Sequence, residues 1–128
     1  MSININDSAS SAFAKQVAVL RRIYPSVDRD LAQLYEDISN QHPGVSQSHA
    51  LPGYDGKVWK YRCDSTDMNR GKSGSFRVLV YFRPSDGVAY PICIYQKKDY
   101  EKAKGGQPPN KEIGKWINNL IFTDQDRN

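Results

Sequence analysis

Cysteine and histidine are scarce in this chain of 128 residues, which contains two of each. Cys63 and Cys93 form no Cys-x-x-Cys spacing and have no histidine close by in sequence, so neither a disulfide framework nor a zinc site is indicated. Both fall in runs of β-forming residues, where a free cysteine usually serves as a small buried residue. We therefore expect two buried thiols, on opposite faces of a sheet, and no cofactor or metal.

Long apolar runs are also missing. No stretch approaches the roughly 20 apolar residues that a membrane-spanning helix needs, and residues 1–7 lack the positive region followed by an apolar one that marks a secretory signal. The sequence therefore predicts a cytoplasmic protein. Its length is typical of one domain with its own hydrophobic core, and we assign residues 1–128 to a single domain.

Acidic residues are in the minority, and the basic ones are unevenly spread. The formal net charge is +4, but residues 57–104 contain eleven Lys and Arg against five Asp and Glu, whereas the rest of the chain has a net charge of −2. A local excess of this kind is typical of a surface that binds polyanions. The alternative is a solvated basic face without a ligand.

The first 43 residues predict a strand and two helices. Apolar and polar residues alternate over 2–6, which favours a short strand. Apolar residues at spacings of three and four then predict a helix over 10–23 and a second one that is capped by Ser26 or Asp28 and ends before His42-Pro43. We expect the two helices to form a hairpin that covers a sheet.

The central third reads as an antiparallel meander. Three runs rich in β-branched and aromatic residues span 57–63, 76–82 and 90–98, and they are separated by Gly, Ser, Asn and Asp. Pro91 lacks an N–H for a sheet ladder, so it predicts that the last strand either is an edge strand or begins after this residue. The long polar segment 41–56 is predicted to be a loop.

The chain closes with a polar segment and a third helix. Residues 97–109 are expected to be mobile and to overhang the basic face. Asn110 is a suitable cap for a final helix, whose apolar stripe comprises Ile113, Trp116, Ile117, Leu120 and Ile121. The predicted fold is α+β, with an N-terminal helical hairpin on a small, mostly antiparallel sheet in the order β-α-α-β-β-β, and a C-terminal helix.

Alternation along the three strands separates a core face from a functional one, because successive side chains point to opposite sides. The core face is predicted to carry Trp59, Tyr61, Cys63, Phe76, Val78, Val80, Phe82, Ile92 and Ile94. The opposite face is predicted to carry Lys60, Arg62, Arg77, Tyr81, Tyr95 and Lys97. Leu79 and Cys93 are predicted to share this opposite face.

Cations and aromatic rings on one sheet face suit single-stranded RNA or DNA. Lys60 and Arg62 are two residues apart on one strand, about 6.5 to 7 Å between Cα atoms, which is close to the phosphate repeat of an extended strand. Arg77 adds a planar fork of donors for a phosphate. Tyr81 and Tyr95 supply rings for base stacking, although packing is the alternative role for each.

A catalytic version of this face would cleave RNA without a metal. The ribose 2′-hydroxyl would be the nucleophile, with Arg62 and Arg77 stabilising the charge that develops on the phosphate. Crowded cations lower the pKa of a lysine, so Lys60 or Lys97 is a candidate base. His49, in the predicted loop, is read as a solvated or capping residue. No acidic cluster for Mg²⁺ appears on the three strands.

The segments Leu51-Pro-Gly, Lys60-Tyr-Arg62, Gly71-Lys-Ser-Gly-Ser-Phe-Arg77-Val-Leu-Val-Tyr81 and Ile94-Tyr-Gln-Lys-Lys98 resemble the RelE/HigB branch of the RelE/ParE toxins of bacterial toxin–antitoxin systems. Ser75 and Phe76 stand where this family more often has Gly and Tyr. The resemblance implies a RelE-like fold, mRNA cleavage typically in the ribosomal A site, inhibition of translation, and suppression by a cognate antitoxin.

The resemblance also implies residue roles. By position, Lys60 and Arg62 match the family's basic pair, Arg77 its phosphate-binding arginine, and Lys97 or Lys98 the basic group after the last strand. The predicted RNA-binding residues are Lys57, Arg70, Lys72, Tyr81, Tyr95 and Tyr100, of which the last two are candidates for a late catalytic tyrosine. The alternatives are a ParE-like inhibitor of DNA gyrase and a non-catalytic RNA-binding or interaction module.

Overall fold

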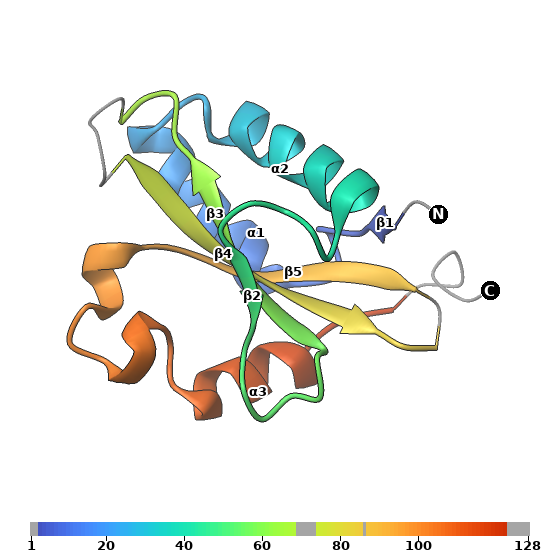
Figure 1. Ribbon diagram of the computed structural model, residues 1–128. Helices are drawn as coiled ribbons and strands as arrows, with labels where there is room; N and C mark the ends of the chain where they lie inside the picture. The colour runs from blue at the N-terminus through green and yellow to red at the C-terminus, as the bar shows by residue number, and fades with distance from the viewer. Residues whose placement is uncertain (1–2, 69–73, 86, 123–128) are drawn as a thin grey trace.

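The computed structural model describes residues 3–68, 74–85 and 87–122, and it shows helices on both sides of one sheet (Figure 1). The helices are α1 (Ser11–Ile23), α2 (Val27–Gln41) and α3 (Asn110–Asn118), and two short 3₁₀ turns, η2 (Lys97–Tyr100) and η3 (Lys104–Gly106), precede α3. The strands are β1 (Asn4–Ile5), β2 (Ser48–Ala50), β3 (Val58–Asp64), β4 (Ser75–Arg83) and β5 (Val88–Gln96). The predicted α+β fold is confirmed.

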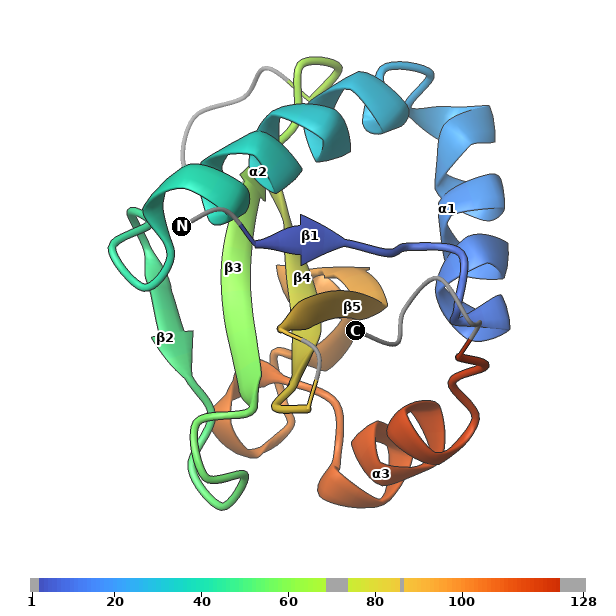
Figure 2. The same cartoon turned by 90° about the vertical axis from the view of Figure 1, so that its right-hand side faces the viewer.

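The five strands form one sheet in the order β1-β5-β4-β3-β2. β1 runs parallel to β5, with Asn4 opposite Val88, and all other neighbours are antiparallel. β1 therefore forms one edge of the sheet, and Figure 2 shows β2 beside β3 at the other. β2 was not predicted, because it lies inside the segment 41–56 that the sequence predicts to be a loop.

The helical hairpin packs on one face of the sheet, as predicted. The Ser10 hydroxyl accepts a hydrogen bond from the Phe13 N–H at 3.1 Å, which caps α1. Apolar residues of α1 and α2, among them Phe13, Leu31 and Ile38, pack against the sheet side chains Tyr61, Cys63, Phe76, Val78 and Val80. None of the helices within 3–68, 74–85 and 87–122 is long and apolar enough to cross a membrane.

A second apolar cluster lies on the opposite face, under α3. Ile113 of α3 is fully buried there, together with Leu79, Cys93 and Tyr95 of the sheet. The face predicted to be basic and aromatic is therefore partly a core. α3 begins at Asn110 itself, so this residue is not the cap, and the helix ends at Asn118. Leu120 and Ile121 consequently follow the helix instead of continuing its stripe.

A β-bulge in β5 corrects one part of the predicted alternation. Leu79 pairs with Cys93 and Val80 pairs with Pro91, which leaves Ile92 as an extra residue between them. Ile92 therefore packs in the cluster under α3 and does not share a face with Ile94. Pro91 lies inside β5, contrary to prediction, next to the extra residue of the bulge, a place where a sheet tolerates proline.

Both cysteines are buried on opposite sides of the sheet, as predicted. Cys63 is 2% exposed in the cluster under α1 and α2, and Cys93 is 1% exposed in the cluster under α3. Burial raises the pKa of each thiol to about 12. Both are thus protonated at neutral pH and serve as packing residues.

The residues that follow α3 return to the segment that precedes α1. The Ile121 N–H donates to the Ala9 carbonyl at 2.9 Å. Phe122 lies edge to face against Tyr90, with 5.1 Å between ring centroids, and under the guanidinium of Arg83. Segments from both ends of the sequence therefore meet beside β5.

His42, at the end of α2, is surrounded by aromatic rings. Its imidazole stacks on Phe82 with 4.3 Å between ring centroids and meets Trp59 edge to face at 4.5 Å. The Tyr61 hydroxyl is 2.6 Å from His42 Nδ1. Burial raises the pKa of the Tyr61 phenol, so the phenol keeps its proton and this contact joins a neutral phenol to the imidazole.

We expect this contact to make folding stability fall in mild acid. Burial lowers the pKa of His42 below its ordinary value of 6.5, so the unfolded chain binds the proton more readily. Stability is therefore fully present above pH 6.5 and is lost as the pH falls through the lowered value. Urea unfolding between about pH 8 and 5 measures the slope.

The two histidines provide a matched comparison. His49 has a lowered pKa too, but its side chain is exposed and lies outside the aromatic cluster. His42→Asn is therefore expected to flatten the pH dependence more than His49→Asn does. Equal slopes for the wild type and His42→Asn would contradict this assignment.

Candidate functional site

Three cations of β3 and β4 lie on the α3 side of the sheet. Arg62 is directly opposite Arg77, and Lys60 is opposite Leu79, one pair further along the same face. Directly paired residues project to the same side, so the grouping expected from the strand alternation is present. Two arginines and a lysine thus form a compact cationic group beside the end of the core under α3.

Short polar contacts orient the two guanidinium groups. Arg62 Nε is 2.8 Å from Asp64 Oδ1, and its Nη1 donates to Gln47 Oε1 at 3.2 Å. Arg77 Nη1 donates to the Ser75 hydroxyl at 2.6 Å. A guanidinium has five N–H donors, so each arginine retains donors for a phosphate after these contacts are made.

Lys60 reaches the segment that follows η2. Its ammonium group donates to the Gly105 carbonyl at 3.4 Å and to Gln107 Oε1 at 3.3 Å. Burial and the positive charge of Arg77 lower the pKa of Lys60. The lysine therefore gives up a proton more readily than one in water, which suits a group that transfers protons.

His49 of β2 belongs to the same group. It pairs directly with Lys60, so its imidazole projects from the same face. Burial and the charge of Lys60 lower its pKa, which favours the neutral ring that can accept a proton. Sequence reasoning missed this placement, because the three residues of β2 have no periodic pattern of their own.

The predicted tyrosines occupy different environments. Tyr95 pairs with Arg77 but is only 4% exposed, and Tyr100 covers it edge to face with 5.0 Å between ring centroids. Its ring therefore offers no open face for a base, which corrects its predicted stacking role. Tyr100 is half-buried. Tyr81 pairs with Val58 and lies four residues from Arg77, about 13 Å along the strand.

The remaining predicted cations lie outside the cationic group. β5 ends at Gln96, where a reciprocal pair of hydrogen bonds with Asp99 turns the chain into η2. Lys97 and Lys98 are therefore exposed on that turn, so Lys97 does not continue the strand face as predicted. Lys57 is exposed just before β3. The predicted RNA-binding residues Arg70 and Lys72 lie outside the described residues.

Within 3–68, 74–85 and 87–122, no three His, Cys, Asp or Glu side chains lie together as a metal site requires.

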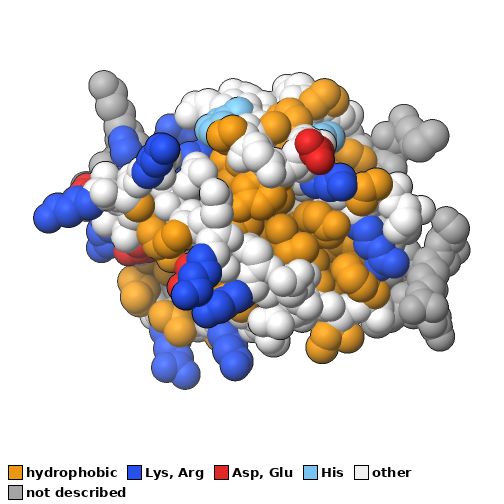
Figure 3. Space-filling view, turned by 90° about the horizontal axis from the view of Figure 1, so that it is seen from below, with side chains coloured by type: hydrophobic (Ala, Val, Ile, Leu, Met, Phe, Trp, Pro, Cys, Tyr) orange, Lys and Arg blue, Asp and Glu red, His pale blue; other side chains and the backbone are white. Residues whose placement is uncertain are grey.

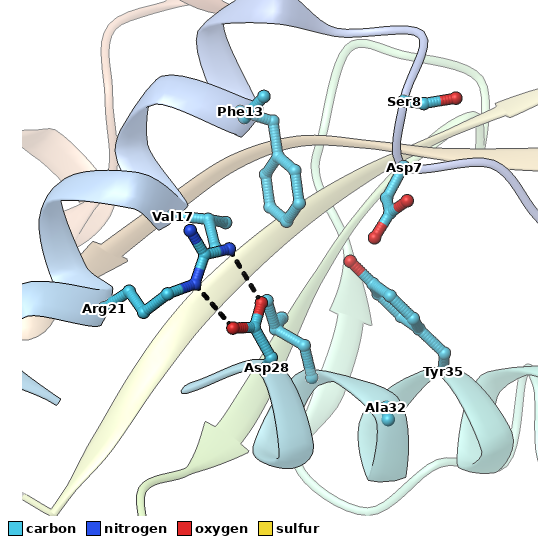
Figure 4. Close-up of a pocket in the computed structure, with 10 residues that line it drawn as sticks. Asp7, Ser8, Phe13, Val17, Arg21, Asp28, Ala32 and Tyr35 are labelled. Atoms are coloured by element: carbon cyan, nitrogen blue, oxygen red, sulfur yellow. Dashed lines mark hydrogen bonds and ion pairs between the residues drawn. The ribbon is translucent and has the colours of Figure 1, made fainter. Parts of the chain in front are cut away.

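A separate hollow lies on the other side of the sheet, between the two N-terminal helices (Figure 4). Its volume is ≈ 440 Å³, and Phe13 and Val17 of α1 and Tyr35 of α2 contribute to its lining. Arg21 and Asp28 form an ion pair at its rim, with 2.6 Å between Nε and Oδ2. This hollow is apolar at its base and carries no part of the cationic group.

Comparisons with known proteins place the fold. No protein-family profile matches the sequence, and no curated protein matches it. Among solved structures, the free state of an E. coli toxin RelE mutant with two arginines replaced by alanine aligns with 94% of this chain and 100% of that one. The TM-score is 0.55 and the sequence identity is 10%. This likeness concerns the fold, and the chain has a RelE-like fold.

Proposed function

We propose that this protein is the toxin of a toxin–antitoxin system and cleaves mRNA as a metal-independent endoribonuclease. The observation that carries the proposal is the direct pairing of Arg62 with Arg77, next to a lysine whose pKa is lowered. Its presence on a RelE-like fold supports this function over a solvated basic face. The substrate is proposed to be mRNA on the ribosome, as in the RelE/HigB branch, and the location cytoplasmic.

The reaction follows from the placement of the groups. Arg62 and Arg77 hold the phosphate between them, and the ribose 2′-oxygen attacks the phosphorus while losing its proton to a base. The bond from phosphorus to the 5′-oxygen then breaks, and that oxygen takes up a proton. Lys60 and His49, paired across β2 and β3, are the two groups that transfer these protons. The products are a 2′,3′-cyclic phosphate and a 5′-hydroxyl.

The two arginines provide the electrostatic part of catalysis. Negative charge on the phosphate oxygens grows in the transition state, and donors already fixed in position stabilise it without reorganising. Asp64, Gln47 and Ser75 fix these donors before substrate binds. A cognate antitoxin is the proposed regulatory partner, because a chain that cleaves mRNA requires inhibition in its own cell.

The product ends test this function. Purified protein is incubated with free RNA in excess EDTA and, separately, with mRNA on translating ribosomes, and the new ends are mapped chemically. We expect cleavage on ribosomes, with 2′,3′-cyclic phosphate and 5′-hydroxyl ends. If free RNA is cleaved as well, its cleavage rate should be the same with EDTA as without it. Intact RNA bound at undiminished affinity would instead support a non-catalytic RNA-binding module. DNA damage with intact RNA in growth-arrested cells would support a gyrase inhibitor.

A further inference from the structure

A second hollow lies directly beside the cationic group. Its volume is ≈ 530 Å³, and it lies between the loop after β2, the η3 turn and the start of α3. It is lined by Pro52, Ala103, Lys104, Gly105, Gln107, Pro108, Pro109 and Asn110. Figure 3 shows this side of the molecule, where hydrophobic side chains gather at the centre and Lys and Arg side chains lie around and beside them.

Lys60 joins this hollow to the candidate site. Its ammonium group contacts Gly105 and Gln107, and both of these residues line the hollow. The Tyr54 hydroxyl donates to Asn110 Oδ1 at 2.9 Å and ties the loop after β2 to α3. A nucleotide whose phosphate is held by the cations therefore has an adjacent, structurally supported cavity for a neighbouring base.

The lining suits a planar base with a polar edge. Pro52, Ala103 and Pro109 offer apolar surfaces for a ring. The polar side chains that accompany them are those of Lys104, Gln107 and Asn110. Among these three, Gln107 is the one in contact with the candidate site, through Lys60. Because an ammonium group only donates, Gln107 must turn its Oε1 towards Lys60. Its amide NH₂ is then the part that remains for a ligand, and this group donates.

We propose that this hollow is a base-binding subsite, and that Gln107 selects a base with a keto oxygen, namely guanine or uracil. Adenine and cytosine present an amino group at the corresponding position. This amino group is a donor and would face the NH₂ of Gln107, which is also a donor. The proposal rests on the proposed function, since the cleaved phosphate fixes which base enters. Lys60 thus determines which bases Gln107 selects, because it fixes the orientation of the Gln107 side-chain amide.

Binding of uncleavable RNA tests the selection. Short 2′-O-methyl oligonucleotides lack the nucleophile and differ only in one base beside the central phosphate. We expect those with guanine or uracil at this position to bind about 3- to 10-fold more tightly than those with adenine or cytosine, as expected of one hydrogen bond. Gln107→Met should abolish the preference, and Gln107→Glu, which can only accept, should reverse it.

Two further variants make the result decisive. Gln33→Met, on α2, changes the same residue type on the opposite side and should retain the wild-type preference. Ala103→Phe fills the hollow without removing Gln107, so it should remove the preference even if a Gln107 variant folds poorly. The mapped cut sites should show the same preference for guanine or uracil beside the cleaved phosphate.

The outcomes separate this proposal from the proposed function. If Gln107→Met and Ala103→Phe both keep the wild-type base preference, the subsite proposal is overturned. This holds even if cleavage depends on Arg77 and the proposed function stands. Selective binding that depends on Gln107, without any cleavage, would support the subsite and overturn the ribonuclease. Absence of both binding and cleavage in the wild type would overturn both proposals.

Discussion

Replacing Arg77 by alanine is expected to lower the rate of RNA cleavage about 10²- to 10³-fold, the usual cost of losing one fixed transition-state donor. Arg77 lies at the centre of the cationic group, opposite Arg62, and Ser75 orients its guanidinium. Single-turnover rate constants at saturating protein isolate the chemical step from substrate binding. The effect should therefore appear in the rate constant at saturation.

Two comparisons locate the origin of this loss. Arg77→Lys keeps the charge but not the planar fork, so it should recover only part of the rate. Arg29→Ala removes an exposed arginine of α2, on the other side of the sheet, and should leave the rate unchanged. Cleavage by Arg77→Ala at the wild-type rate would exclude the proposed role of this residue.

Replacing Phe76 by alanine is expected to lower the free energy of unfolding by about 3–5 kcal/mol. Its ring is fully buried under the helical hairpin and meets Tyr24 edge to face, with 5.4 Å between centroids. The substitution leaves a cavity that the surrounding helices and sheet fill only partly. Urea unfolding at constant pH measures the change.

Phe122 supplies the matched control for Phe76. It is 36% exposed and packs at the edge of the structure, against Tyr90 and Arg83. Phe122→Ala should therefore cost less than about 1.5 kcal/mol, since only part of its ring leaves water on folding. Similar losses for the two variants would contradict the assignment of Phe76 to the main core.

The elements with a repeating pattern could be predicted from the sequence, and those held by distant partners could not. The helices and the three long strands carry their own apolar periodicity. β2 is three residues long, and only its pairing with β3 makes it a strand. The bulge at Ile92 likewise depends on the register with β4, although Pro91 signals that the ladder cannot be regular there.

The candidate site divides in the same way. Strand alternation predicts that Lys60, Arg62 and Arg77 share a face, because antiparallel pairing preserves the side of each residue. It does not predict that Tyr95 is covered, because alternation within β5 does not show that η2 turns Tyr100 back onto it or that α3 packs on the same face. His49 joins the site only through the unpredicted strand.

The parallel pairing of β1 with β5 has a consequence for the order of events during synthesis. Asn4 pairs with Val88, so the earliest strand must wait for a partner 84 residues later. Contacts of such sequence separation carry a large loop-closure entropy and form slowly. A nascent chain still emerging from the ribosome therefore has an unpaired sheet edge, and the proposed nuclease becomes competent only after β5 has been released.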